Sequence, residues 1–308
     1  MLSTEEFVVR NPYRSSKEEF HLSCAPNDEF VAGWMRKGWL FEPFNLHVLS
    51  EILDPQSVIL DVGAHIGTFS VVLGKLLPQS RIHAFEPQVP LYSILLKNLE
   101  KNGVENCQPF NLAVAHRQTL SAVQRAVRDG NGAGKAVAYG DPGRYNFAGL
   151  SLGLGEHVVA CIRLDEFVAK AGLPRVDLIK IDVEGAEPFV LYGARKILSE
   201  HRPILHFEEN DKRVTPELAR GLGCSVTHAA ARFSVRYRLK DDGYLYLRMP
   251  FDNVMLAPSE ALSPQILELF EKQPSDSRYF QDMYVFRQDE FSRGYRPESK
   301  PVPSRRKK

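Results

Sequence analysis

The stretch VILDVGAHIGTF, residues 58–69, decides the fold of this chain. Its first residues are mostly apolar and predict a buried strand, which carries Asp61 to the edge of a sheet. Gly63 and Gly67 follow, and glycines let a backbone pass close to a ligand. Apolar residues at helical spacing come next, at positions 66, 69, 72, 73, 76 and 77. A strand, a glycine turn and a helix in this order predict the start of a βαβ unit.

Short apolar runs alternate with helical periodicity as far as residue 210, which predicts an α/β, Rossmann-like fold: a mostly parallel, doubly wound sheet with helices on both faces. The expected strands are Ser57–Val62, Arg81–Glu86, Cys107–Ala113, Val158–Ile162, Val176–Asp182 and Ile204–Glu208. The expected helices between them are Thr68–Leu77, Pro90–Lys101 and Glu187–Leu198. Phe233–Leu239 and Tyr244–Met249 are expected to pair as a hairpin.

The composition of the 308 residues is that of an ordinary globular protein. No apolar run approaches the roughly 20 residues that span a bilayer. The first residues carry acids where a secretion signal carries bases. The four cysteines show neither a CxxC pair nor paired histidine spacing, which argues against a zinc site or a disulfide framework. We therefore expect a cytoplasmic protein with reduced cysteines.

The net charge of +1 hides a basic tail. From residue 291 onward, seven Lys or Arg residues face Glu298 alone. Prolines and glycines in this tail predict disorder, although docking to an anionic partner stays open. Since the rest of the chain is not basic, we expect no nucleic-acid partner.

Several polar or small residues fall at the ends of the expected strands: Asp61, Glu86, Ala113, Asp182 and Glu208. In open α/β sheets, ligands bind beyond the carboxyl ends of the strands, at the point where strand order reverses. We therefore expect these residues to line one rim.

The glycine turn favours one kind of ligand. Turns that bind NAD usually read GxGxxG, whereas here the turn runs Gly63, Ala64, His65, Ile66, Gly67 after Asp61. The histidine would crowd a pyrophosphate and the aspartate would repel it. S-adenosylmethionine has no phosphate and carries an ammonium and a sulfonium. We therefore expect S-adenosylmethionine, with its amino-acid part at this turn.

Glu86 is expected to hold both hydroxyls of the cofactor ribose, since Pro87 fixes the following turn. Asn111 and Ala113 are expected near the adenine, although an ordinary strand end explains them almost as well. Asp182 is expected beside the transferred methyl, as the first candidate for a general base, with Glu184 second. His65 and His206 are weaker candidates, and Lys180 is expected in a structural salt bridge.

A metal-assisted reaction is an alternative. Asp182, Glu208, Glu209 and Asn210 offer oxygen ligands at two neighbouring strand ends, which suits Mg²⁺. Acid pairs at strand ends are common without a metal, so a metal-free site remains our main interpretation.

The chain resembles the FkbM family of class I S-adenosylmethionine-dependent methyltransferases. The resemblance rests on residues 59–67, Phe85-Glu86-Pro87, residues 111–114, 164–167 and 177–187, and Arg202-Pro203, and it covers roughly residues 41–258. It implies a Rossmann-like methyltransferase fold that acts on hydroxyls of small molecules, natural products or sugars. It does not name the acceptor.

These features together predict three parts. Residues 1–56 are expected to form a helical cap, residues 57–258 the methyltransferase domain with an irregular glycine-rich insertion at about 117–156, and residues 259–308 a helix and the basic tail. Two other functions stay open: a nicotinamide-dependent oxidoreductase on the same sheet, and a non-catalytic S-adenosylmethionine-binding protein.

Overall fold

A computed structural model of the chain describes residues 4–14, 18–25, 28, 31–123, 126–127, 136–137, 152–153, 157–184, 186–208, 243–249, 253–271 and 285–286. Among the expected features, the strand Phe233–Leu239, the basic tail, Glu209 and Asn210 lie outside these residues. No helix in the described part of the chain has both the length and the apolar character needed to cross a membrane.

The main sheet has eight strands in the described residues. Their order is β16 (Val285–Phe286), β14 (Tyr244–Arg248), β15 (Asn253–Pro258), β13 (Ile204–Glu208), β12 (Leu178–Ile181), β3 (Val58–Val62), β4 (Arg81–Phe85) and β5 (Cys107–Phe110). The strands from β5 to β13 run parallel, and the remaining three are antiparallel to their neighbours. The expected doubly wound, mostly parallel fold is therefore confirmed.

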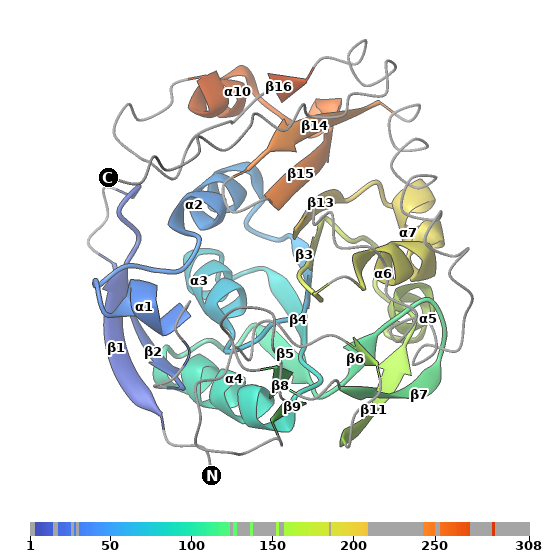
Figure 1. Cartoon of the computed structure of the whole chain (residues 1–308). Helices are drawn as coiled ribbons and strands as arrows, with labels where there is room; N and C mark the ends of the chain where they lie inside the picture. The colour runs from blue at the N-terminus through green and yellow to red at the C-terminus, as the bar shows by residue number, and fades with distance from the viewer. Residues whose placement is uncertain are drawn as a thin grey trace, which may run out of the picture.

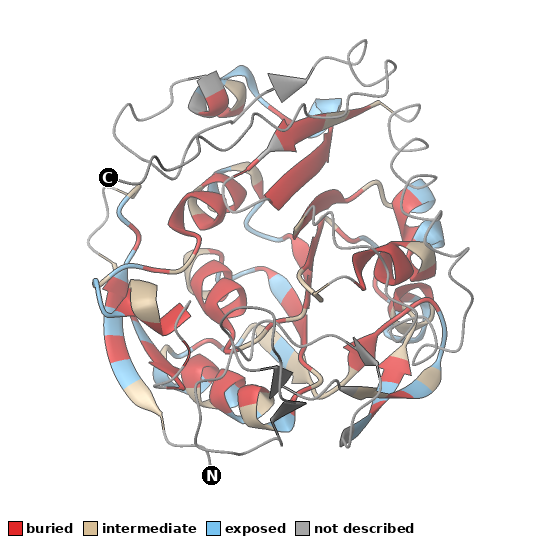
Figure 2. Cartoon of the chain, in the orientation of Figure 1, coloured by how far each residue is buried: buried red, intermediate tan, exposed pale blue. Residues whose placement is uncertain are grey.

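Helices cover both faces of this sheet (Figure 1). One face carries α2 (Pro43–Ile52), α3 (Thr68–Leu76) and α4 (Val89–Lys101), and the other carries α5 (Leu164–Lys170), α6 (Glu187–Gly193) and α7 (Arg195–Glu200). Successive residues of β3 enter opposite cores, since Ile59 packs with the first set and Leu60 with the second. All five residues of β3 are buried, as expected for a central parallel strand (Figure 2).

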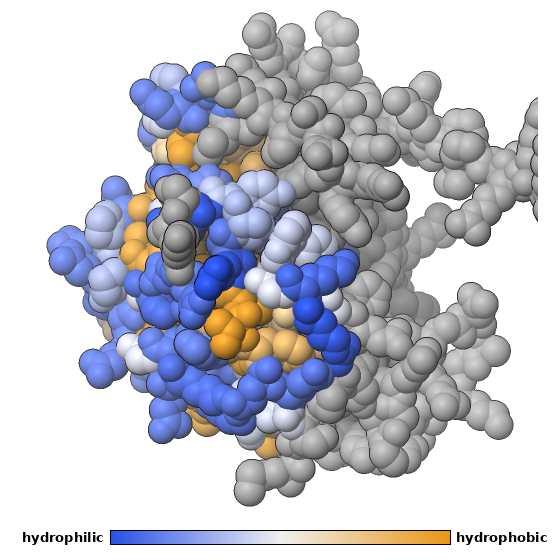
Figure 3. Space-filling view, turned by 90° about the vertical axis from the view of Figure 1, so that its left-hand side faces the viewer, coloured by the Kyte–Doolittle hydropathy of each residue, from blue (hydrophilic) through white to orange (hydrophobic). Residues whose placement is uncertain are grey.

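The N-terminal part differs from the expected helical cap. It begins with an antiparallel hairpin of β1 (Glu5–Arg10) and β2 (Glu19–Cys24), and helices follow only at α1 (Val31–Met35) and α2. Val9, Phe20 and Leu22 are buried while Val8 is half exposed, which is the two-residue period of a strand with one wet face. Figure 3 views the molecule from this side, where most of the described surface is hydrophilic around a central apolar patch.

A second sheet contains β10 (Leu152–Gly153), β7 (Thr119–Val123), β11 (His157–Ile162) and β6 (Ala113–Val114). The expected strand Cys107–Ala113 is therefore wrong at its end, because β5 stops at Phe110 and β6 pairs with Cys161 and Ile162 instead. Residues 119–123, expected to be irregular, form a regular strand against β11. Two short strands, β8 (Ala126–Val127) and β9 (Ala136–Val137), pair with each other.

The expected helix Glu187–Leu198 is divided at Ala194 into α6 and α7. The Asp165 carboxylate accepts hydrogen bonds from the backbone N–H groups of Lys196 and Ile197, both at 3.1 Å. It therefore satisfies amides that a new helix N-terminus leaves without partners. After β15 come a 3₁₀ turn at Ser259–Ala261 and α10 (Pro264–Glu271), whose Phe270 ring packs against Phe44 of α2.

Candidate functional site

A cavity opens at the carboxyl ends of β3, β4 and β12. The chain runs from β3 outward to β5 and then returns to β12 on the other side of β3, so strand order reverses here. The expected residues that line the cavity are Gly63, Ala64, His65, Glu86, Ala113, Asp182 and Glu184. Asp61, Gly67, Asn111 and Glu208 do not line it. Part of the expected rim therefore lines the cavity, and its other residues lie outside the cavity lining.

The glycine turn is fixed by hydrogen bonds to the next strand. The N–H groups of Gly63 and Ala64 both donate to the carbonyl of Phe85, at 2.9 and 3.0 Å. Gly63 has a φ of 77°, and a Cβ atom there would lie 1.8 Å from the carbonyl oxygen of Asp182. Only glycine therefore fits where the turn meets the end of β12.

Glu86 faces the cavity from the end of β4. One carboxylate oxygen accepts the backbone N–H of His65 at 2.9 Å, and the other accepts that of Gln88 at 2.8 Å. Burial raises the pKa of Glu86 to about 7, although both amide hydrogen bonds act in the opposite direction. Each oxygen keeps a second lone pair for a ligand hydroxyl.

Asp61 lies beneath the cavity rather than in it. Its Oδ2 atom accepts the Ser70 hydroxyl at 2.7 Å, and its Oδ1 atom lies 3.4 Å from Nζ of Lys180. The direct contact expected between Asp61 and the cofactor's amino-acid part is therefore not what this geometry provides, because the side chain is turned into the protein and only 1% exposed.

Lys180 connects Asp61 to the cavity. Its ammonium donates to the carbonyl of Gly63 at 2.8 Å and lies 3.6 Å from Oδ2 of Asp182. Burial alone would lower the pKa of Lys180, but the charges of Asp61, Asp182 and Glu42 outweigh it and the pKa is raised. The lysine is thus charged, and it joins the glycine turn to Asp182. This agrees with the structural salt bridge expected from the sequence.

Asn111 holds the main chain in place. Its side-chain amide donates to the carbonyls of Glu86 and Pro87, at 2.8 and 3.0 Å. The residues that line the cavity after it are Leu112, Ala113 and Val114. An apolar wall of this kind suits the face of an adenine ring, with Asn111 supporting it from behind.

Three acids meet beside the cavity. One carboxylate oxygen each of Asp182, Glu184 and Glu208 lies within 4.8 Å of the other two. Such spacing is compatible with a divalent cation, but exposed acids commonly lie this close without one, so the cluster by itself assigns no metal. Of the three, Asp182 and Glu184 line the cavity, and the Asp182 side chain is 39% exposed.

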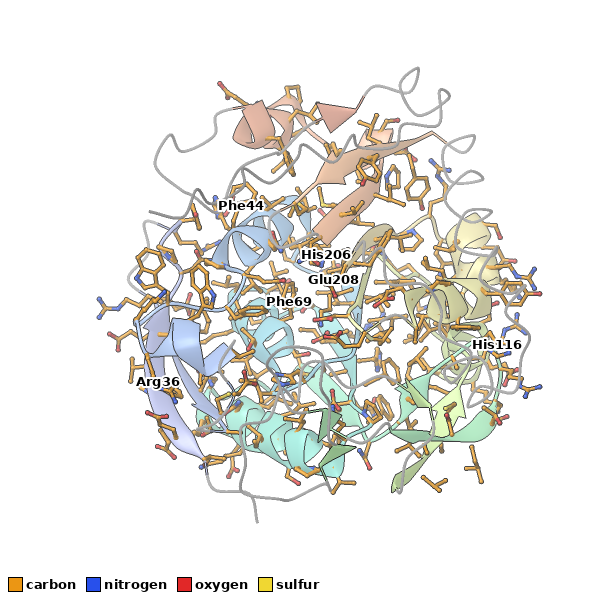
Figure 4. All side chains as sticks on the ribbon, in the orientation of Figure 1. Arg36, Phe44, Phe69, His116, His206 and Glu208 are labelled. Atoms are coloured by element: carbon orange, nitrogen blue, oxygen red, sulfur yellow. The ribbon has the colours of Figure 1, made fainter. Side chains whose placement is uncertain are left out.

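The two histidines named as weaker candidates for the general base, His65 and His206, differ in position. His65 lines the cavity, with its Nε2 atom 3.5 Å from Oδ2 of Asp28 and its pKa lowered by burial. His206 is buried on β13 next to Phe69 of α3, and neither ring nitrogen has a hydrogen-bond partner in the described part of the chain (Figure 4). Burial, assisted by the charge of Lys180, lowers the pKa of His206 to about 3. His206 is therefore a neutral core residue and does not line the cavity.

Sequence reasoning missed Glu42. This buried carboxylate accepts hydrogen bonds from the side chains of Asn253 and Asn45, at 2.7 and 3.1 Å. Burial raises its pKa to about 7, and the negative charge of Asp182 contributes in the same direction. Its neighbour Phe41 lines the cavity. No local signal marks Glu42, because its partner Asn253 lies 211 residues away in the sequence.

The family of the chain follows from residues 61–233, which include the glycine turn, Glu86 and the acid cluster. They match the family model described as Methyltransferase FkbM domain, over more than half of the chain. The chain belongs to the FkbM methyltransferase family. The family expected from the sequence is thereby confirmed, and the cavity described above is the candidate site of this FkbM-family protein.

Two curated relatives show how far the similarity extends. The AMB antimetabolite synthetase AmbE of Pseudomonas aeruginosa is 32% identical over 187 residues, which are 53% of this chain but 9% of that protein. The 31-O-demethyl-FK506 methyltransferase FkbM of Streptomyces tacrolimicus is 29% identical over 157 residues, 46% of this chain and 60% of that protein. The FkbM-family chain thus spans less than two thirds of either relative.

Among solved structures, a methyltransferase FkbM from Methylobacillus flagellatus KT is similar at a TM-score of 0.43 and 15% identity. The match covers 67% of this chain and 45% of that one.

Proposed function

We propose that this FkbM-family protein transfers a methyl group from S-adenosylmethionine to a hydroxyl of a small molecule, sugar or natural product. The observation that carries the proposal is the charge of the cavity. Glu86, Asp182 and Glu184 line it, and the charge of its lysine, Lys180, is already shared between Asp61 and Asp182. An acidic cavity favours a ligand with an ammonium and a sulfonium and disfavours the pyrophosphate of a nicotinamide cofactor.

The residues present fit S-adenosylmethionine. Glu86 is oriented by two amides and can accept the ribose hydroxyls. The turn at Gly63 and Ala64 lines the cavity, so its backbone can approach the amino-acid part. Leu112 and Ala113 form an apolar wall for the adenine. When bound, this cofactor supplies a methyl group on a cationic sulfur, which is a good leaving group.

The protein's own task is to align the acceptor, exclude water and remove one proton. We assign the proton to Asp182, which lines the cavity at the end of β12, and keep Glu184 as the alternative. Lys180 would hold the Asp182 carboxylate toward the cavity through their 3.6 Å ion pair. A carboxylate as general base suits a hydroxyl acceptor, and the name of the Streptomyces relative refers to methylation at an oxygen.

Isothermal titration with S-adenosylhomocysteine, followed by a labelled-methyl screen over hydroxylated metabolites, tests this function. Gly63→Val and Glu86→Ala are expected to weaken cofactor binding. Asp182→Ala is expected to keep binding while lowering kcat by about 100-fold or more, the usual contribution of a general base. Glu200→Ala is the matched control, because Glu200 is a largely exposed acid of α7 outside the cavity.

The results separate the alternatives. Binding of NADH in preference to S-adenosylhomocysteine would favour the oxidoreductase, and tight cofactor binding without methylation of any acceptor would favour a non-catalytic binding protein. Equal loss of binding in all three cavity variants would contradict the assigned roles. Repeating the assay in EDTA tests the metal-assisted alternative, since only a metal-dependent transfer would stop.

A further inference from the structure

A second cavity, of about 590 Å³, lies on the α5 side of the sheet. Side chains from β4, β5, β11 and α5 line it. Among the described lining residues, it shares only Leu112 with the cavity at the strand ends. It is therefore a separate space, and nothing in the proposed methyl transfer uses it.

His83 of β4 is the unusual residue of this cavity. It is 8% exposed, and neither ring nitrogen has a hydrogen-bond partner in the described part of the chain. Its ring packs against those of Phe110 and Phe167, with centroids 6.2 and 5.4 Å away. Burial, assisted by the charge of Arg81, lowers the pKa of His83. A neutral imidazole offers one donor and one acceptor, and leaving both unpaired costs free energy that a bound ligand can recover.

The remaining lining combines flat apolar surface with positive charge. Phe110, Phe167 and Leu173 are apolar, and two of them are aromatic. Arg81 and Lys170 also line the cavity, and neither forms an ion pair with another described residue. Glu166 opposes them with one negative charge, while Arg163 is already paired with Asp165 at 2.7 Å. The unpaired side chains therefore leave one net positive charge, which favours an anion.

We infer that this cavity binds a small aromatic carboxylate. The ring of the ligand packs against Phe110 and Phe167. The ligand's carboxylate accepts a hydrogen bond from the ring of His83 and faces Arg81 and Lys170.

The cavity also adjoins the wall of the candidate cofactor site. The Phe85 ring, which lines that site, lies 5.3 Å from the ring of Phe110 and 5.0 Å from that of Phe167. A ligand on Phe110 and Phe167 would thus contact the back of this wall. Any effect on cofactor affinity must be reciprocal, because the two affinities are thermodynamically linked.

The test uses the whole protein saturated with S-adenosylhomocysteine, so that the first cavity is filled. Benzoate is the probe and benzyl alcohol its uncharged counterpart, and binding is followed by titration calorimetry and ligand-observed NMR. We expect benzoate to bind with a dissociation constant on the order of 1 mM, as suits a fragment of this size. Benzyl alcohol is expected to bind about tenfold more weakly, because it lacks the charge.

Three variants locate the binding. His83→Phe keeps a ring but removes both nitrogens, and Arg81→Glu reverses one charge on an exposed side chain, so each is expected to weaken benzoate about tenfold or more. His201→Phe is the matched control, because His201 also has a buried ring nitrogen without a partner but lies outside the cavity. Arg81→Glu keeps the test decisive if His83→Phe does not fold.

The inference is overturned if benzoate shows no binding, if Arg81→Glu binds it as the unmodified protein does, or if S-adenosylhomocysteine displaces it competitively. Loss in the cavity variants, with normal binding in His201→Phe, supports it.

Discussion

Glu86 is a carboxyl group whose environment acts on it in two directions. Burial favours its protonated form, while the N–H groups of His65 and Gln88 favour the carboxylate. The outcome is a pKa of about 7, so Glu86 titrates near physiological pH. A protonated Glu86 donates one hydrogen and has lost part of its capacity to accept hydrogen bonds from a ribose.

Cofactor binding should therefore depend on pH. In the proposed site it is the ionised form that binds the ribose, so affinity for S-adenosylhomocysteine is expected to fall as pH falls through about 7, by about tenfold between about pH 8 and about pH 6. Calorimetry at several pH values measures this. Glu86→Gln cannot titrate, so its affinity is expected to be lower and independent of pH. If the affinity of Glu86→Gln still changed with pH, a group other than Glu86 would cause the pH dependence.

Both Glu42 and Glu86 have raised pKa values of about 7, which fixes the sign of their contribution to stability. Each takes up its proton more readily in the folded than in the unfolded state. Their stabilising effect is thus fully present below the ordinary carboxyl pKa of about 4.5 and is lost as pH rises through about 7.

Lys180 compensates the negative charges of Asp61 and Asp182. Lys180→Met would leave Asp61 and its neighbours without their cation, and the free energy of unfolding is expected to fall by about 3–5 kcal/mol. Urea denaturation measures the change. Lys196→Met is the control, because Lys196 is largely exposed in its pair with Glu200, and no measurable change is expected. If both variants were equally stable, the buried lysine would not have the role assigned here.

At the scale of elements, the turn between β3 and α3 depends on glycine at one residue in particular. Gly63→Ala would place Cβ 1.8 Å from the carbonyl oxygen of Asp182 and impose a left-handed conformation on alanine. The free energy of unfolding is expected to fall by about 2–5 kcal/mol, from overpacking and backbone strain together.

Gly103→Ala separates those two causes. Gly103 also has a positive φ, of 63°, but a Cβ there meets nothing within 4 Å. Only the backbone strain of about 1–2 kcal/mol is expected in this control. Urea denaturation compares the two variants, and an equal loss in both would mean that the close approach to Asp182 relaxes without cost.

The sequence predicted elements well where the signal is local. Apolar runs and helical spacing placed β3, α3, α4 and β13 to within a residue or so of their observed bounds. It failed where a distant group ends an element. Strand β5, which begins at Cys107, ends at Phe110 because the side chain of Asn111 donates to the carbonyls of Glu86 and Pro87. Helix α7 begins at Arg195 because Asp165 caps its N-terminus. Neither partner is visible in the local pattern.

The same limit applied to the candidate site. Glycines and acids in short motifs predicted Gly63, Glu86 and Asp182 at one cavity, because parallel strands end at a common edge. The inward turn of Asp61 depends on Lys180 and Ser70, and the place of Glu42 depends on Asn253. Contacts between side chains that lie far apart in the sequence produce no local pattern from which they could be predicted.

At the scale of the whole molecule, Asn98 joins three parts of the chain. Its side chain on α4 exchanges two hydrogen bonds with Ser23 of the hairpin, at 2.7 and 3.0 Å, and donates to the carbonyl of Ile66 in the glycine turn at 2.8 Å. It is fully buried. The side-chain amide of Asn98 therefore connects the hairpin to the glycine turn.

Asn98→Ala should reveal this connection. It would leave buried backbone groups of Ser23 and Ile66 without partners, so the free energy of unfolding is expected to fall by about 3 kcal/mol and cofactor affinity to drop as well. Asn102→Ala is the control, since Asn102 binds the same hairpin at His21, but in an exposed position, and about 1 kcal/mol is expected. Unchanged cofactor affinity in Asn98→Ala would show that the turn is independent of the hairpin.

The connection through Asn98 has a practical consequence for anyone who recombines this protein with relatives. The strands β1 and β2 lie at the N-terminal side of the fold, yet Ser23 of β2 is joined through Asn98 to the glycine turn, which is proposed to contact the methionine part of the cofactor. A chimera that takes its N-terminal hairpin from a relative should therefore also take α4 from that relative. Otherwise we expect it to bind S-adenosylmethionine more weakly.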